Sequence, residues 1–139
     1  MIAIVLPQPQ HTHMYREAAE TADVVSDQID RNVGLLGSVA ERINAFSPKF
    51  AVTCARGSSD HAATYAKYLI EMYLGLPTCS AAPSVSSVYQ REQRYERALY
   101  IAISQSGKSP DLLTSVKRAK EAGALTLALV NVTASPLAE

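Results

Sequence analysis

The 139-residue chain has no net charge, because its 13 lysines and arginines balance its 13 aspartates and glutamates. A balanced chain sets up no long-range field toward nucleic acid or an anionic membrane surface, so any anion must be held by local groups. The chain also lacks any apolar run close to the ~20 residues that cross a bilayer. We therefore expect a cytoplasmic protein that contacts neither nucleic acid nor membrane.

Cysteine and histidine are scarce, which limits metal and nucleophile chemistry. Cys54 and Cys79 form no CxxC pair and sit in apolar runs, so we expect reduced, buried core thiols. His11 and His13 form an HxH pair, but a metal there would need further ligands. Only His61 remains as a base for a serine nucleophile, and nothing resembles a hydrolytic triad. The patterns GxGxxG and GxxxxGK[ST] are also absent, and we predict no metal and no cofactor.

The first part of the chain divides into a lead-in and a helical segment. Residues 1–12 begin with a short apolar stretch that prolines interrupt, and they lack the basic start of a signal peptide, so we predict a flexible lead-in. Residues 13–47 carry apolar side chains every three or four positions, which is the spacing of an amphipathic helix. We expect one long helix or two, with the break at Gly34 and Gly37.

Residues 48–139 alternate between strand and helix patterns and form the main domain. Apolar or β-branched runs predict strands, and amphipathic runs that end at glycine or proline predict helices. The expected strands span 50–55, 78–81, 99–104 and 125–130, and the expected helices span 59–74, 83–90 and 110–122. Strands that alternate with helices require a parallel sheet, because each crossover returns the chain to the same end. We therefore predict an α/β fold.

The chain ends at NVTASPLAE, shortly after the fourth expected strand. A sheet that stops there leaves its last strand at or near an edge. We therefore expect the domain to be incomplete and to belong to a longer polypeptide.

Two polar loops follow strands of the same expected sheet. The first strand runs into Arg56, Gly57, Ser58 and Ser59, and the third runs into SQSGKS at 104–109. In open parallel sheets, ligands bind beyond the carboxyl ends of the strands, where the strand order reverses. Each loop precedes a helix whose first N–H groups lack partners and whose dipole favours negative charge. Phosphate is the anion that best suits such a combination of glycine and serine.

Ordinary loop chemistry also explains these residues. Ser58, Ser59 and Ser109 are good helix N-caps, and Gly57 and Gly107 suit tight turns. Either loop alone fits capping as well as ligand binding. Two such loops at one edge of the sheet favour a phosphate site.

Four neighbouring side chains each leave two interpretations open. Arg56 could pair with a phosphate or form a salt bridge. Asp60 could bond to a ligand hydroxyl or complement the helix dipole. His61 could reach a sugar oxygen or be a plain polar helix residue, and Lys108 could lend charge or face solvent.

Three segments resemble the sugar isomerase (SIS) domain: CARGSSDHAATYAKYLIE, LPTCSAAPS and YIAISQSGKSPDLLTSVKRAKEAGALTLALVNVTASPLA. They look most like the first of two such domains in the isomerase part of glucosamine-6-phosphate synthase, and in the related glucosamine-6-phosphate deaminases and isomerases. SQSG followed by a hydroxyl residue two positions on is the most telling motif. The resemblance implies a three-layer, flavodoxin-like sandwich around a five-stranded parallel sheet, so the fifth strand and the second SIS domain are absent here.

The resemblance also implies where a sugar phosphate would bind. It maps contacts of the phosphate loop onto Ser104, Gln105, Ser106 and Ser109, and contacts at the end of the first strand onto Ser58 and Ser59. Gly57 and Gly107, which let the backbone approach a ligand closely, complete the candidate substrate-binding set.

Departures from the family pattern restrict the activity. The glutaminase domain of the synthase and its catalytic cysteine are absent, so glutamine-dependent transfer is not expected. SQSGKSPD has Lys and Pro where the synthase commonly has Glu and Ala, which favours the deaminase-like relatives. The family's acid–base glutamate, ring-opening histidine and tail lysine come from a second domain and a neighbouring subunit, so the catalytic residues are unknown for this chain.

We therefore predict the phosphosugar-binding part of an aldose-ketose isomerase or deaminase that acts on glucosamine 6-phosphate or fructose 6-phosphate, with the fragment alone inactive. One alternative is a regulatory module that senses a sugar phosphate without catalysis, and another is an interaction domain whose serines only cap helices. The tyrosine-rich helix, with Tyr65, Tyr68 and Tyr73 as core or interface residues, and the unfinished sheet predict a homodimer or pairing with a second SIS domain.

Overall fold

The structure is a computed structural model that describes residues 8–139, and the chain divides into two units. Unit 1 covers residues 1–41 and unit 2 covers residues 42–139. The lead-in predicted for 1–12 falls largely outside the described residues. Its described end contains a short 3-10 helix, η1, at Pro9–His11.

Unit 1 is helical throughout its described elements. Helix α1 spans His13–Ala19, and the Thr12 hydroxyl caps it by accepting the Tyr15 N–H at 3.2 Å. Helix α2 spans Thr21–Phe46 and runs on into unit 2. The prediction of helix for residues 13–47 therefore describes this segment well.

The predicted position of the helix break is wrong. The two helices meet at Glu20, and α2 continues through Gly34 and Gly37. Neither glycine has a positive φ, so neither turns the chain out of the helix. A glycine inside a helix costs about 1 kcal/mol relative to alanine, which weakens a helix without ending it.

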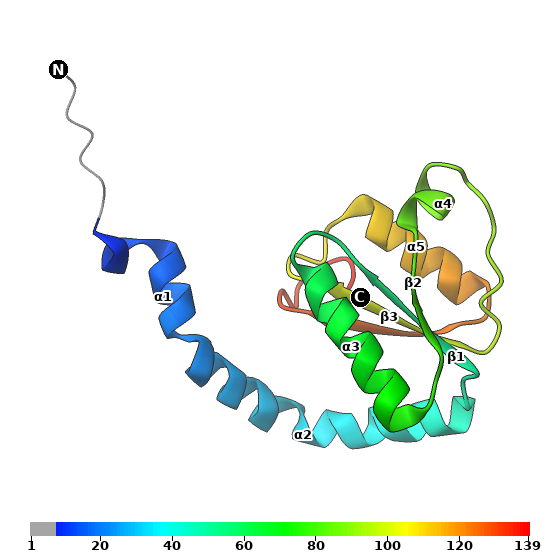
Figure 1. Cartoon of the computed structure of the whole chain (residues 1–139), viewed down its shortest axis with the longest axis horizontal. Coiled ribbons are helices and arrows are strands. Elements are labelled where there is room, and N and C mark those ends of the chain that lie inside the picture. The colour runs from blue at the N-terminus through cyan, green and yellow to red at the C-terminus, as the bar shows by residue number, and fades with distance from the viewer. Residues whose placement is uncertain (1–7) are drawn as a thin grey trace. The chain divides into compact units, whose positions relative to one another are not determined.

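Unit 2 is built on a four-stranded, all-parallel sheet (Figure 1). Its strands are β1 at Phe50–Ala55, β2 at Thr78–Ser80, β3 at Ala98–Ser104 and β4 at Leu125–Val130. Its further helices are α3 at Ser59–Leu74, α4 at Pro83–Ser87 and α5 at Pro110–Glu121. The α/β prediction and its order of elements are confirmed, with boundaries that shift by a few residues at most.

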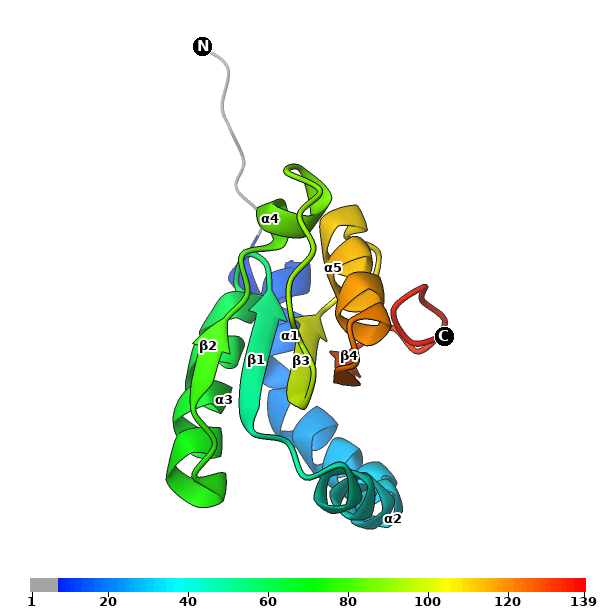
Figure 2. The same ribbon diagram turned by 90° about the vertical axis from the view of Figure 1, so that its right-hand side faces the viewer.

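Helices cover both faces of the sheet, which makes three layers. Helices α3 and α5 lie on opposite sides of the strands (Figure 2). Val52 of β1 and Leu112 of α5 belong to one hydrophobic core, and Ala51 of β1 and Ile70 of α3 belong to the other. Successive strand residues point to opposite faces, so β1 and β3 supply both cores and are almost entirely buried.

One expectation about burial is wrong, and one of two alternatives for another is excluded. Cys54 is a free, buried thiol as predicted, whereas Cys79 is free but exposed, because it lies in the three-residue edge strand β2. The three tyrosines of α3 are 62–76% exposed, so they are not core residues of this chain. Among the described helices, none is long and apolar enough to cross a membrane.

Candidate functional site

The strand order β2-β1-β3-β4 reverses direction between β1 and β3. From β1 the chain passes through α3 to one edge of the sheet, and from β3 it passes through α5 to the other edge. The loops that leave β1 and β3 therefore diverge at the carboxyl ends of two adjacent strands, where Ala55 pairs with Ile103. Open α/β sheets bind ligands at such a point. The fold brings the two predicted loops, 56–59 and 104–109, together beyond the carboxyl ends of β1 and β3.

The loop after β3 is held in shape by its own serines. The buried Ser104 hydroxyl accepts the Gly107 N–H at 3.0 Å, and the Ser106 hydroxyl accepts the Lys108 N–H at 3.4 Å. Gly107 has a φ of +64°, a left-handed conformation that glycine adopts without strain. These bonds make a tight turn at the start of α5 and leave Gln105 exposed to solvent.

Several backbone N–H groups of this loop remain free for a ligand. Within residues 8–139, the N–H groups of Gln105, Ser106 and Ser109 donate to no protein acceptor. Ser109 occupies the N-cap position of α5, yet its side chain makes no capping bond. Free amides at a helix N-terminus, together with the helix dipole, attract anions.

The loop after β1 has similar features. Gly57 has a φ of +59°, and Ser58 is the N-cap of α3 without a side-chain capping bond. The two amides that a cap at Ser58 would bind are already used, because Asp60 donates to the Gly57 carbonyl at 3.1 Å and His61 donates to the Ser58 carbonyl at 3.2 Å. The hydroxyls of Ser58 and Ser109 therefore make no cap in this chain.

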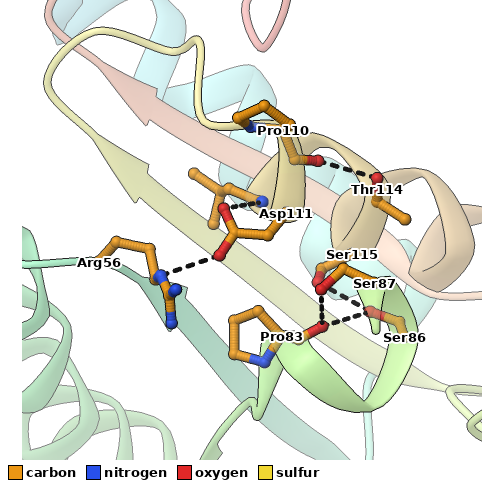
Figure 3. Close-up of polar contacts among 9 residues, drawn as sticks. Arg56, Pro83, Ser86, Ser87, Pro110, Asp111, Thr114 and Ser115 are labelled. Atoms are coloured by element: carbon orange, nitrogen blue, oxygen red, sulfur yellow. Dashed lines mark hydrogen bonds and ion pairs between the residues drawn. The ribbon is translucent and has the colours of Figure 1, made fainter. Parts of the chain in front are cut away.

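An ion pair connects the two loops (Figure 3). The Nε atom of Arg56, the first residue after β1, lies 2.9 Å from Oδ2 of Asp111 in the first turn of α5. The other carboxylate oxygen of Asp111 accepts the Leu112 N–H at 3.0 Å. Of the two interpretations of Arg56, the salt bridge is the one that this structure contains.

The segment after β4 contributes a residue that sequence reasoning missed. Residues 131–139 return to the loop after β3, where the Leu137 N–H donates to the Gly107 carbonyl at 3.2 Å. Ser135 is 1% exposed, its hydroxyl has no hydrogen-bond partner within residues 8–139, and it lies directly against Gly107. The segment NVTASPLAE follows a strand of the same parallel sheet, so it leaves the sheet at the same end as the two loops. That position is the signal that could have predicted a contribution from this segment.

A cluster of hydroxyl groups lies in the core on the α5 side of the sheet. The buried Ser86 of α4 and Ser115 of α5 have their hydroxyl oxygens 2.9 Å apart, and the Pro83 carbonyl accepts the Ser86 hydroxyl at 3.0 Å (Figure 3). Burial raises the pKa of the nearby Tyr100 phenol and of the Cys54 thiol, so both stay neutral. This cluster fixes α4 to α5 and does not reach the two loops.

Other chemistry has less support from the geometry. A cavity of about 810 Å³ lies between the segment that precedes β3 and the last part of α5, lined by residues such as Arg91, Tyr95 and Arg118. It contains none of the predicted site residues. Among the described residues, no three His, Cys, Asp or Glu side chains gather as metal ligands do.

A doubly wound parallel domain with two glycine- and serine-rich loops at its switch point defines a class of α/β proteins that bind anionic ligands. The chain belongs to the SIS domain family, because the model of that family, described as "SIS domain", matches residues 46–139. The family predicted from the motifs is therefore confirmed.

Known proteins place the chain more narrowly. It is 46% identical to a protein of Silicibacter pomeroyi DSS-3 assigned as a phosphosugar isomerase, with a TM-score of 0.85 over 88% of this chain and 38% of that one. It is 34% identical to the glutamine–fructose-6-phosphate aminotransferase (isomerizing) of Thermococcus kodakarensis, over 88% of this chain and 20% of that protein. The enzyme of the same name from Aquifex aeolicus is 30% identical over 89% of this chain and 20% of its own length. The chain thus spans about a fifth of these aminotransferases.

Proposed function

We propose that the chain is the phosphosugar-binding SIS domain of an amino sugar phosphate isomerase or deaminase, acting on glucosamine 6-phosphate or fructose 6-phosphate. The single observation that carries the proposal is the pair of loops at the switch point, with free N–H groups at Gln105, Ser106 and Ser109. Membership of the SIS family and the names of the relatives support the substrate class.

In this proposal the two loops bind the phosphate and the sugar. The free amides of Gln105, Ser106 and Ser109 and the serine hydroxyls of the candidate set donate to phosphate oxygens, and the dipoles of α3 and α5 favour the negative charge. Binding energy at the phosphate holds the reacting carbons in place, although the phosphate takes no part in the reaction. The reaction is a proton transfer between adjacent carbons of the opened sugar, through an enediol-type intermediate. In the deaminase case water also replaces the amino group, which leaves as ammonia.

The catalytic acid–base groups come from outside this chain in our proposal. The first turns after the two loops carry three polar side chains, Asp60, His61 and Asp111. Asp111 is already engaged by Arg56 and by the Leu112 N–H. A second SIS domain or a second subunit would supply the remaining groups, so the chain alone binds the sugar phosphate without turnover.

The same observation supports a second candidate, a module that senses a sugar phosphate and controls a partner. Binding alone does not separate the two. A measurement of product formation separates the enzyme from the sensor. A chain joined to a second SIS domain interconverts sugar phosphates if it is an enzyme, and only binds them if it is a sensor.

We also propose that the chain forms a homodimer or pairs with a second SIS domain, and that it is cytoplasmic. The exposed apolar side chains of α3, Tyr65, Tyr68 and Tyr73, suit an interface. Two free cysteines suit a reducing compartment. Sedimentation at increasing concentration tests the dimer, and a well-folded monomer at high concentration contradicts it.

Isothermal titration calorimetry with glucosamine 6-phosphate and with fructose 6-phosphate tests the site. We expect heat of binding with the wild-type chain and a large loss of affinity with Ser104→Ala and Ser106→Ala combined. Ser84→Ala is the matched control, because Ser84 is an exposed serine of α4 outside the two loops. No heat with the wild type, or equal heats for wild type and the double variant, rejects the site.

A further inference from the structure

The ion pair between Arg56 and Asp111 leaves part of the arginine unused. The contact uses Nε, and no other hydrogen bond or ion pair of Arg56 occurs among the described residues. A guanidinium group has a second edge, formed by its two Nη atoms, which binds two oxygens of a phosphate or carboxylate side by side. That edge remains available in this structure.

The arginine stands where the two loops of the proposed site meet. Arg56 directly precedes Gly57 in the first loop, and its partner Asp111 follows the second loop by two residues. The Arg56 side chain is 59% exposed, whereas the Asp111 side chain is 25% exposed. The carboxylate is therefore the less exposed partner, and the guanidinium faces solvent at the carboxyl end of the sheet, where a ligand would arrive.

The Arg56–Asp111 ion pair also affects how well the loop after β3 can bind an anion. Asp111 lies in the first turn of α5, so an unpaired carboxylate there would repel a phosphate at the free amides of the loop. Both of its oxygens are occupied, Oδ2 by Arg56 and Oδ1 by the Leu112 N–H. The arginine thus neutralises the one acidic side chain in the first turn of α5.

We propose that Arg56 contacts the anionic group of the sugar through its two Nη atoms, and that Asp111 is a positioning residue that holds Arg56 by Nε. The assignment rests on the phosphosugar-binding function proposed above and adds a determinant of specificity. Arg56 makes the site prefer a phosphorylated sugar over the same sugar without phosphate.

If the ion pair only stabilises the fold, we expect a different result. Removal of Arg56 or of Asp111 would then break the same ion pair and change the affinity equally. We compare Arg56→Lys and the three variants described next by calorimetry with glucosamine 6-phosphate, inorganic phosphate and glucosamine. Arg56→Gln removes the proposed contact, Asp111→Asn removes only the support, and Lys120→Gln is a control that removes one positive charge from the far end of α5. Urea denaturation of each variant shows whether it is folded.

We expect Arg56→Gln to weaken the affinity for glucosamine 6-phosphate about 10- to 100-fold, the usual cost of a charged hydrogen-bonded contact. Asp111→Asn should weaken the affinity only a few-fold, because the arginine remains but loses the charged partner that holds it. Arg56→Lys should lie between the wild type and Arg56→Gln, since it keeps the charge but loses the planar fork. Lys120→Gln should have the wild-type affinity for glucosamine 6-phosphate. All variants should have the same affinity for glucosamine, which carries no phosphate.

The outcomes separate this inference from the function on which it rests. If the wild type gives no heat with glucosamine 6-phosphate and none with inorganic phosphate, the phosphosugar-binding function itself is refuted. If the wild type binds but Arg56→Gln binds equally well, the role of Arg56 alone is refuted. The same holds if folded Arg56→Gln and Asp111→Asn lose affinity equally.

Discussion

Replacement of Gly107 by alanine is the sharpest test of how the loop after β3 is packed. Gly107 has a φ of +64°, and a Cβ atom there would lie 2.7 Å from the Ser135 Cβ, still closer to the Ser135 hydroxyl, and 3.0 Å from Val130 Cγ1. Contacts below 3.0 Å force a shift of the neighbouring atoms, and Ser135 has little room because it is 1% exposed. The substitution therefore combines backbone strain with overpacking.

The expected magnitude follows from these two contributions. A left-handed conformation costs a residue with a Cβ about 1–2 kcal/mol, and overpacking costs about 1–3 kcal/mol. Gly107→Ala should therefore lower the free energy of unfolding by about 2–5 kcal/mol. Gly57→Ala is the matched control, because Gly57 has a φ of +59° but no atom within 4 Å of its Cβ position. It should cost only the backbone contribution, about 1–2 kcal/mol.

Urea denaturation followed by circular dichroism measures these differences. A second comparison isolates the contact: in a Ser135→Gly background, Gly107→Ala should cost much less and approach the cost of Gly57→Ala, because only the 3.0 Å contact with Val130 Cγ1 remains. The difference between the two backgrounds should be about 1–3 kcal/mol, the usual coupling between residues in contact. Equal costs for Gly107→Ala and Gly57→Ala in the wild-type background would refute the packing of the 131–139 segment against this loop.

Three further predictions concern the core. Leu112→Ala should lower the free energy of unfolding by about 2–5 kcal/mol, because the leucine is 1% exposed and its removal leaves a cavity; a loss near zero in urea would contradict the core on the α5 side. Cys79 should react quickly with a thiol reagent in the folded chain and Cys54 only after unfolding, and equal protection of the two would contradict their placement. Stability should fall as pH rises above about 9, because burial raises the pKa of Cys54 and of Tyr100 above their ordinary values of 9.0 and 10.0, so unfolding releases protons there. Tyr100→Phe should make that fall shallower in urea titrations between pH 8 and about 11, and an unchanged slope would count against the burial of the phenol.

The sequence predicted the secondary structure of unit 2 closely because its signals are local. A buried β-branched run such as 50–55 is a strand wherever both faces are covered, and Gly75 ends α3 because it adopts a φ of +64°. The amphipathic pattern of α3 was less reliable. Ala63 and Ile70 are buried, while Ala62 and Tyr73 are exposed. The sheet ends at the short edge strand β2. One side of α3 therefore stays exposed among the described residues.

The sequence alone determined the order of strands and helices, the parallel sheet, and the presence of two serine loops at one edge, since these depend on periodicity and on glycine positions. It also predicted the SIS family through those loops. Only the tertiary structure decided that Arg56 pairs with Asp111, that Ser135 packs against Gly107 and that Cys79 faces solvent. These facts depend on distances between residues far apart in the chain, and the packing of strands and helices sets such distances while local sequence patterns do not.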